Sequence, residues 1–86
     1  MPSLHQVVLY TRASCHLCDE VKATLTRLEK RGGLSFTWKE VDVDSDPALQ
    51  QRFNDEVPVV FIDGKKAFKY RMSERDFLQV LAAREP

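Results

Sequence analysis

Cysteine is scarce in this sequence, which holds only Cys15 and Cys18 among 86 residues. So low a count excludes a secreted scaffold held together by several disulfides, because small domains of that kind are dense in cysteine. An excess of charge of one sign is also lacking, since 13 Lys and Arg residues balance 13 Asp and Glu residues. A chain without net positive charge does not have the composition of a dedicated nucleic-acid-binding protein, so no nucleic-acid partner is expected.

Long apolar runs are missing as well. No stretch approaches the roughly 18 apolar residues of a membrane-spanning helix, so we expect no membrane contact. Residues 1–6 show no basic segment followed by an apolar run, which predicts a cytoplasmic protein without a signal peptide. The hydrophobic fraction of 43% argues against disorder and predicts one domain over residues 1–86, which we expect to be a monomer.

Apolar periodicity predicts seven segments of regular structure. Strands are expected where β-branched and aromatic residues concentrate, at residues 6–11, 36–43, 59–62 and 66–70. Helices are expected where apolar residues recur every three or four positions, at residues 15–31 and 47–54 and from residue 74 onward. The pattern over residues 36–43 does not show which side of that strand is buried, because both parities carry apolar side chains.

Short-range signals mark the ends of these segments. Asp46 and Pro47 have the pattern of an N-cap followed by proline at the first helical position. Asp63 and Gly64 predict a tight turn that closes a hairpin, and Ser73 predicts the start of the last helix. The order is therefore β-α-β-α-β-β-α, which predicts an α/β fold with a four-stranded mixed sheet and helices on both faces.

The two cysteines lie at the predicted start of the first helix, as Cys15-His16-Leu17-Cys18. Residues three apart share one face of a helix, so the two sulfurs come within bridging distance. Unpaired N–H groups and the positive end of the helix dipole favour an anion at Cys15, which predicts a low-pKa nucleophile. Cys18, one turn further and near Val21, is expected to be more buried and to act as the resolving thiol.

A cysteine pair with this spacing has three other known uses. A purely structural disulfide would stabilise the fold by only about 2 kcal/mol, because the loop it closes is so short. Structural zinc needs a set of four ligands, for which the sequence offers Cys15, Cys18, His5 and His16; we expect no metal. Haem attachment requires histidine directly after the second cysteine, where the sequence has Asp19.

Two separated segments resemble glutaredoxins in the same order and spacing. They are residues 8–18 (VLYTRASCHLC) and residues 56–64 (EVPVVFIDG). The chain is most similar to the small glutaredoxin-like proteins of the thioredoxin-like superfamily. This resemblance implies a thioredoxin-like fold of the glutaredoxin type. It also implies a dithiol–disulfide oxidoreductase that acts on protein disulfides or glutathione mixed disulfides, without a tightly bound cofactor and with glutathione as a co-substrate.

The resemblance also implies roles for residues around the cysteine pair. Pro58 is expected to be cis and to pack beside Cys15, and the backbone of Val57 is expected to pair with an extended substrate. Arg12 occupies the position of a basic residue that contacts the glycine carboxylate of glutathione. His16, when protonated, would stabilise the Cys15 thiolate, and the alternative is a solvated histidine without catalytic effect.

The chain also departs from the glutaredoxin pattern. Phe68 and Lys69 stand where a pair of glycines is usual, and we expect their side chains to crowd the substrate groove. Glu56 replaces the usual threonine before Val57 and would bring negative charge near an anionic ligand. The missing glycine pair favours one alternative, a non-catalytic redox-sensing or binding module on the same fold. A further alternative is a carrier of an iron–sulfur cluster or metal bridged by Cys15 from two chains together with external thiols.

Overall fold

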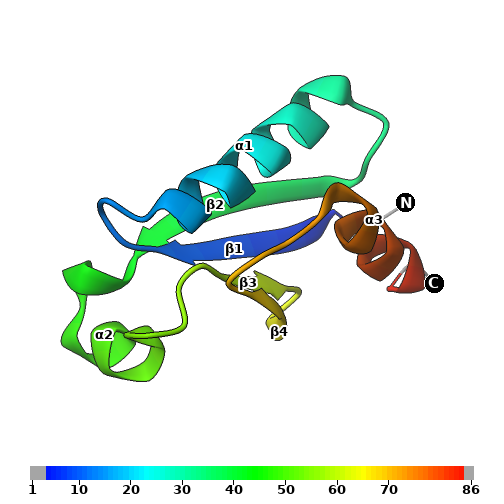
Figure 1. The fold of residues 1–86 in the computed structure, drawn as a ribbon. Coiled ribbons are helices and arrows are strands. Elements are labelled where there is room, and N and C mark those ends of the chain that lie inside the picture. The colour runs from blue at the N-terminus through cyan, green and yellow to red at the C-terminus, as the bar shows by residue number, and fades with distance from the viewer. Residues whose placement is uncertain (1–3, 85–86) are drawn as a thin grey trace.

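Strand β1 (His5–Thr11) is an inner strand of the sheet in the computed structural model, which describes residues 4–84. The strand order is β2-β1-β3-β4. Strand β1 pairs in parallel with β2 (Phe36–Asp42) and antiparallel with β3 (Val59–Ile62), and β3 pairs antiparallel with β4 (Lys65–Lys69). The predicted four-stranded mixed sheet is confirmed (Figure 1).

The helices cover both faces of this sheet, as the sequence predicts. Helices α1 (His16–Arg31) and α3 (Glu74–Ala83) bury their apolar stripes in one cluster with β1 and β3. Helix α2 (Pro47–Phe53), which follows the 3₁₀ turn η1 (Val43–Ser45), packs against the opposite face. The part of the chain that the structure describes has no helix both long and apolar enough to cross a membrane.

Two apolar clusters form the core, one on each face of the sheet. The larger lies under α1 and α3 and consists of Val7, Leu9, Val21, Leu25, Leu28, Phe36, Val60, Ile62, Met72, Phe77 and Leu81. The smaller lies under α2 and consists of Val43, Phe53 and Val59, with Tyr10, Leu49, Val57 and Phe61 packed against it. Strands β1 and β3 contribute to both clusters because successive side chains of a strand point to opposite faces.

The structure shows how the apolar side chains of residues 36–43 are buried, which the sequence pattern leaves open. Phe36 and Trp38 pack in the larger cluster, whereas Val43 is buried in the smaller one. The strand ends one residue earlier than predicted, because the side chain of Asp42 accepts a hydrogen bond from the Asp44 N–H and begins the 3₁₀ turn. Phe36 and Trp38 of the strand therefore pack on one face of the sheet, and Val43, in the turn after the strand, packs in the cluster on the other face.

The hairpin between β3 and β4 turns at Asp63 and Gly64, as predicted. Both residues have positive φ, 52° and 81°, which suits a two-residue hairpin turn. Asp63 Oδ2 lies 2.7 Å from Nδ1 of the buried His5, and Asp63 Oδ1 accepts the Gln6 N–H at 2.9 Å. The contact with His5 and the Gln6 N–H hold the pKa of the Asp63 carboxyl below its ordinary value.

Candidate redox site

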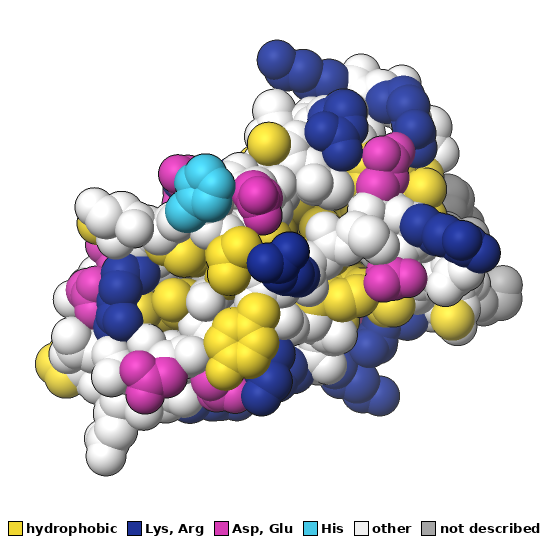
Figure 2. All heavy atoms as spheres, viewed as in Figure 1, with side chains coloured by type: hydrophobic (Ala, Val, Ile, Leu, Met, Phe, Trp, Pro, Cys, Tyr) yellow, Lys and Arg dark blue, Asp and Glu magenta, His cyan; other side chains and the backbone are white. Residues whose placement is uncertain are grey.

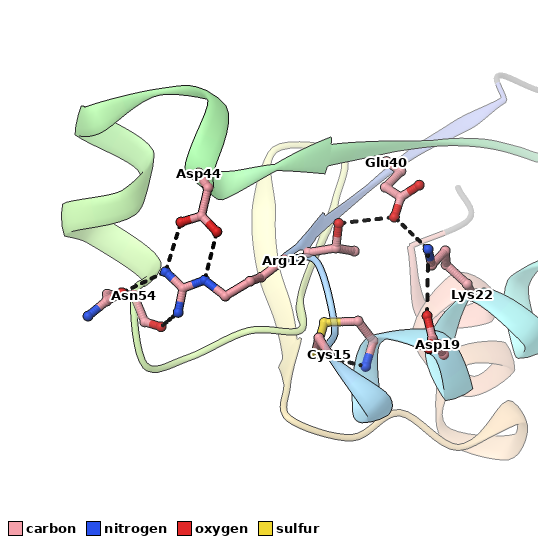
Figure 3. The surroundings of a disulfide bond; sticks show 9 residues. Arg12, Cys15, Asp19, Lys22, Glu40, Asp44 and Asn54 are labelled. Atoms are coloured by element: carbon pink, nitrogen blue, oxygen red, sulfur yellow. Dashed lines mark hydrogen bonds and ion pairs between the residues drawn. A yellow bond between two sulfur atoms is a disulfide. The ribbon is translucent and has the colours of Figure 1, made fainter.

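Cys15 and Cys18 form a disulfide at the start of α1. Cys15 is the N-cap of this helix, and the Cys18 N–H donates to Cys15 Sγ over a distance of 3.1 Å (Figure 3). Cys18 is only 1% exposed, whereas Cys15 is half-buried. Cys15 is therefore the more exposed of the two cysteines, while Cys18 lies on the buried face of the helix.

The chain reverses direction just before Cys15. Ser14 adopts φ 61°, in the left-handed region that non-glycine residues use in tight turns. This turn brings Cys15 from the end of β1 to the first turn of α1, where backbone N–H groups lack helical partners. The geometry thus presents Cys15 Sγ to free hydrogen-bond donors at the amino end of a 16-residue helix.

Arg12, expected from the resemblance to bind substrate, makes four hydrogen bonds within the protein (Figure 3). Its Nε and Nη2 donate to the two carboxylate oxygens of Asp44 at 3.0 and 3.1 Å. Its Nη1 donates to the Asn54 carbonyl at 2.8 Å, and Nη2 also donates to Asn54 Oδ1 at 2.6 Å. The hydrogen bonds between Arg12 and Asp44 raise the pKa of Arg12 and lower the pKa of Asp44. The bonds to Asn54 connect the loop before Cys15 to the end of α2.

A second polar network lies on the β2 side of the same loop. Glu40 Oε2 accepts a hydrogen bond from the Thr11 hydroxyl at 3.0 Å and lies 2.8 Å from Lys22 Nζ. Lys22 is also 3.7 Å from Asp19, one turn earlier on α1. The hydrogen bond from Lys22, reinforced by Thr11, lowers the pKa of Glu40. Sequence reasoning missed this network, because the pairing of Glu40 with Lys22 depends on how α1 packs beside β2.

The Val57–Pro58 peptide bond is cis. Pro58 is buried, and its carbonyl accepts a hydrogen bond from the Tyr70 N–H at 2.8 Å. The next residue, Val59, pairs with Tyr10 on β1 and with Lys69 on β4. Pro58 therefore lies at the end of the sheet from which β1 leads to Cys15, and the direct contact of Pro58 with Cys15 stays a prediction.

Phe68 and Lys69, which depart from the glutaredoxin pattern, belong to the edge strand of the sheet. Phe68 and Lys69 both lie in β4, paired with Val60 and Val59. The position opposite Pro58 belongs to Tyr70, one residue beyond the two that were expected to crowd the groove. Strand β4 lies one residue earlier than predicted at both of its ends, and the crowding of the groove by Phe68 and Lys69 stays a prediction.

Glu56 does not present an unpaired negative charge. Its Oε1 lies 2.9 Å from Lys66 Nζ and 3.5 Å from Lys69 Nζ. The hydrogen bond from Lys66 is the main reason that the pKa of Glu56 is lowered, and Lys69 adds to it. Two lysines of the edge strand β4 thus compensate the carboxylate that was expected to repel an anionic ligand.

The two histidines lie apart from each other. The side chain of His16 is 89% exposed, and its Nε2 is 3.9 Å from Glu20 Oε1 on the outer side of α1. His5 is at the opposite end of β1 from the cysteine loop, about 20 Å away along the strand. The four candidate zinc ligands, Cys15, Cys18, His5 and His16, therefore do not come together within one chain.

Comparison with known proteins gives the following sequence relationships. The family described as Glutaredoxin-like domain (DUF836) matches residues 6–82. Protein Rv0508 of Mycobacterium tuberculosis is 35% identical over 72 residues, which cover 80% of this chain and 74% of that protein. A glutaredoxin-like protein of Dictyostelium discoideum, the YDR286C homolog, is 33% identical over 69 residues, which cover 76% of this chain and 64% of that protein.

Solved structures show the same architecture. Protein Ne2328 from Nitrosomonas europaea is 29% identical, with a TM-score of 0.74 over 91% of this chain and 92% of that one. Protein XcR50 from X. campestris is 27% identical, with a TM-score of 0.72 over 90% of this chain and 96% of that one. Thioredoxin-2 of the malaria parasite, at 17% identity and a TM-score of 0.74 over 98% of this chain and 86% of that one, shares the fold.

Proposed function

Because this chain belongs to the glutaredoxin-like family within the thioredoxin-like superfamily, we propose that it is a dithiol–disulfide oxidoreductase with Cys15 as the nucleophile. The observation that carries this proposal is the position of the half-buried Cys15, whose Sγ accepts the Cys18 N–H at the N-cap of α1. Cys18, in bonding distance of Cys15 and almost fully buried, has the position of a resolving thiol.

The reduced protein would transfer two electrons to a substrate disulfide in two exchanges. The Cys15 thiolate attacks one substrate sulfur, the substrate S–S bond breaks, and the released thiolate takes a proton from water. Cys18 then loses its proton to solvent and attacks Cys15 Sγ, which re-forms the Cys15–Cys18 disulfide and releases the second substrate thiol. A thiol reductant such as glutathione would restore the dithiol by the reverse chemistry, so glutathione serves as a co-substrate and no resident cofactor is needed.

The substrate would lie along the segment that contains Val57. The backbone N–H and C=O of Val57 make no hydrogen bond within residues 4–84, although the strand that follows is paired on both sides. An extended glutathione or peptide segment can satisfy these groups as an added strand beside the reacting sulfur. Arg12 keeps one unused N–H on Nη1, which allows a single hydrogen bond to a substrate carboxylate.

The decisive experiment is the pH dependence of Cys15 alkylation in the pre-reduced protein. Iodoacetamide should react with Cys15 at neutral pH with an apparent pKa well below 8.5, because the helix start stabilises the thiolate. The variant C18S isolates the reaction of Cys15, and C15S provides the matched measurement for Cys18. A Cys15 that titrates like a model thiol, near 8.5, would contradict the proposal.

A further inference from the structure

Tyr70 combines an exposed aromatic ring with an unfavourable backbone conformation. Its side chain is 42% exposed, and Leu4 is the only other large hydrophobic residue that is exposed within residues 4–84. Its φ of 69° lies in the left-handed region, which glycine adopts readily and a bulky aromatic residue rarely adopts. A conformation of this kind, kept at an exposed aromatic residue, points to a function for the ring.

The backbone of Tyr70 is anchored beside the redox site. Its N–H donates to the Pro58 carbonyl at 2.8 Å, and the preceding Lys69 pairs with Val59. Val59 in turn pairs with Tyr10 near the end of β1, so Tyr70 lies two strands from the segment that leads to Cys15. Two strand spacings are about 10 Å, which a substrate segment of three or four extended residues spans easily.

A surface groove adjoins Tyr70 on the side of α1. It has a volume of about 320 Å³ and is lined by Glu20, Val21, Thr24, Arg71, Met72 and Ser73. The α1 residues of this lining begin only two positions after Cys18, and its other residues directly follow Tyr70. Figure 2 shows hydrophobic side chains gathered on the face that also carries the one visible histidine, with Lys, Arg, Asp and Glu side chains between and around them.

The charge next to the Tyr70 ring is positive. The Arg71 side chain is exposed and makes no ion pair or side-chain hydrogen bond with any residue of the 4–84 range. Lys69 Nζ lies 5.3 Å from the centre of the Tyr70 ring, but Lys69 also pairs with Glu56. Arg71, which directly follows Tyr70 in the chain, is therefore an exposed cation that remains available to an acidic partner.

We propose that Tyr70 and Arg71 form a specificity surface for polypeptide disulfides, a proposal that rests on the oxidoreductase function proposed above. An apolar side chain next to the attacked cysteine packs on the Tyr70 ring, and an acidic side chain beside it pairs with Arg71. Glutathione has no apolar side chain to place on the ring, so this surface favours a polypeptide substrate over glutathione.

Two synthetic peptides closed by the same intramolecular disulfide test the proposal. One carries Leu and Glu directly after its second cysteine, and the other carries Ser and Gln there. Pre-reduced full-length protein is mixed with each peptide in a single turnover, and the reduced peptide is quantified by mass spectrometry after acid quenching. Bis(2-hydroxyethyl) disulfide, which has no side chains, is the reference substrate.

The wild-type protein should reduce the Leu–Glu peptide about tenfold faster than the Ser–Gln peptide, the effect of one well-packed interface contact. Y70G should remove most of this preference for the Leu–Glu peptide. R71Q should remove the share of the preference that comes from the Glu side chain of the peptide. Glycine suits the backbone at position 70, so Y70G should unfold at no lower urea concentration than the wild type. L4A is the matched control, because Leu4 is similarly exposed but precedes β1 at the far end of the sheet.

A wild-type protein that reduces both peptides equally fast would overturn the specificity surface, as would a preference that survives in Y70G. A further outcome is that Y70G slows the reduction of bis(2-hydroxyethyl) disulfide as much as that of the Leu–Glu peptide. That result would also overturn the specificity surface, because bis(2-hydroxyethyl) disulfide cannot contact the ring through a side chain. Failure of the wild type to reduce even bis(2-hydroxyethyl) disulfide would contradict the oxidoreductase function itself, and the specificity with it.

Discussion

The guanidinium group of Arg12 lies against the carboxylate of Asp44, with Nε and Nη2 donating to its two oxygens at 3.0 and 3.1 Å. Paired hydrogen bonds of this kind fix the relative orientation of two groups as well as their distance. Because Arg12 also binds the Asn54 carbonyl, it joins three segments: the loop before Cys15, the 3₁₀ turn after β2, and the end of α2. Arg12 thus links the loop that leads to the redox site with two segments that are distant in the sequence.

Replacing Arg12 should therefore disturb the geometry of the site more than the binding of glutathione. Lysine cannot form the paired contact with Asp44, so we expect R12K to lower kcat for bis(2-hydroxyethyl) disulfide about tenfold. D44N should have a similar effect, and the double variant should be no worse than either single variant, because both remove the same contact. Steady-state kinetics with glutathione as the reductant measure these values.

The glutathione-binding role implied by the resemblance makes a different prediction for the same variants. If Arg12 acts mainly on a glutathione carboxylate, R12K should raise KM for glutathione while D44N leaves both kcat and KM unchanged. That outcome would contradict a positioning role for Arg12. The comparison works because Asp44 pairs with Arg12 but offers no group that attracts an anionic ligand.

The two cysteines should fail in different ways when replaced. C15S should abolish disulfide reduction, because Cys18 is too buried to reach a substrate. C18S should retain the first exchange and accumulate a mixed disulfide on Cys15, visible as an added mass on the intact protein. Equal turnover by the two variants would contradict the assignment of nucleophile and resolving thiol. Absence of turnover in the wild type would favour the redox-sensing alternative.

Stability should fall in acid, partly through Asp63. The pKa of this carboxyl is below its ordinary value of 3.8, because it is bonded by His5 and the Gln6 N–H. Its contribution is therefore fully present above about pH 4 and is lost as pH falls through the lower pKa of the folded state. D63N should lower the free energy of unfolding in urea at pH 7. Between pH 4 and pH 2, the free energy of unfolding should then fall less in D63N than in the wild type. An unchanged pH dependence would contradict this role.

Phe53 should be important for the stability of the face that carries α2. It is 2% exposed, and its ring centre lies 4.7 Å from that of Tyr10 and 5.8 Å from that of Phe61. F53A should lower the free energy of unfolding by about 3–5 kcal/mol, the usual cost of truncating a buried phenylalanine. Urea unfolding followed by circular dichroism measures it, with L4A as an exposed control. A loss below about 1 kcal/mol would contradict this prediction and show that neighbouring side chains fill the space left by the Phe53 ring.

Much of the fold could be predicted because its signals are local. The spacing of Val21, Leu25 and Leu28 alone indicates the buried face of α1, and all three are buried. The turn at Asp63 and Gly64 and the cap at Ser73 were likewise predicted, and Ser73 accepts the Asp76 N–H as an N-cap should. Several element boundaries differ from the prediction by one residue; that of β2 does so because the capping bond of Asp42 competes there with strand pairing.

By itself, the sequence determined the order of strands and helices and the position of a cysteine pair at the start of α1. These features depend on residues within a few positions of one another, where backbone geometry links pattern to structure directly. The tertiary structure alone decided that Arg12 faces Asp44, that Glu56 is paired with Lys66, and that Tyr70 lies opposite Pro58. Such pairings depend on how distant strands align, and a shift of one residue would turn each side chain to the other face of the sheet.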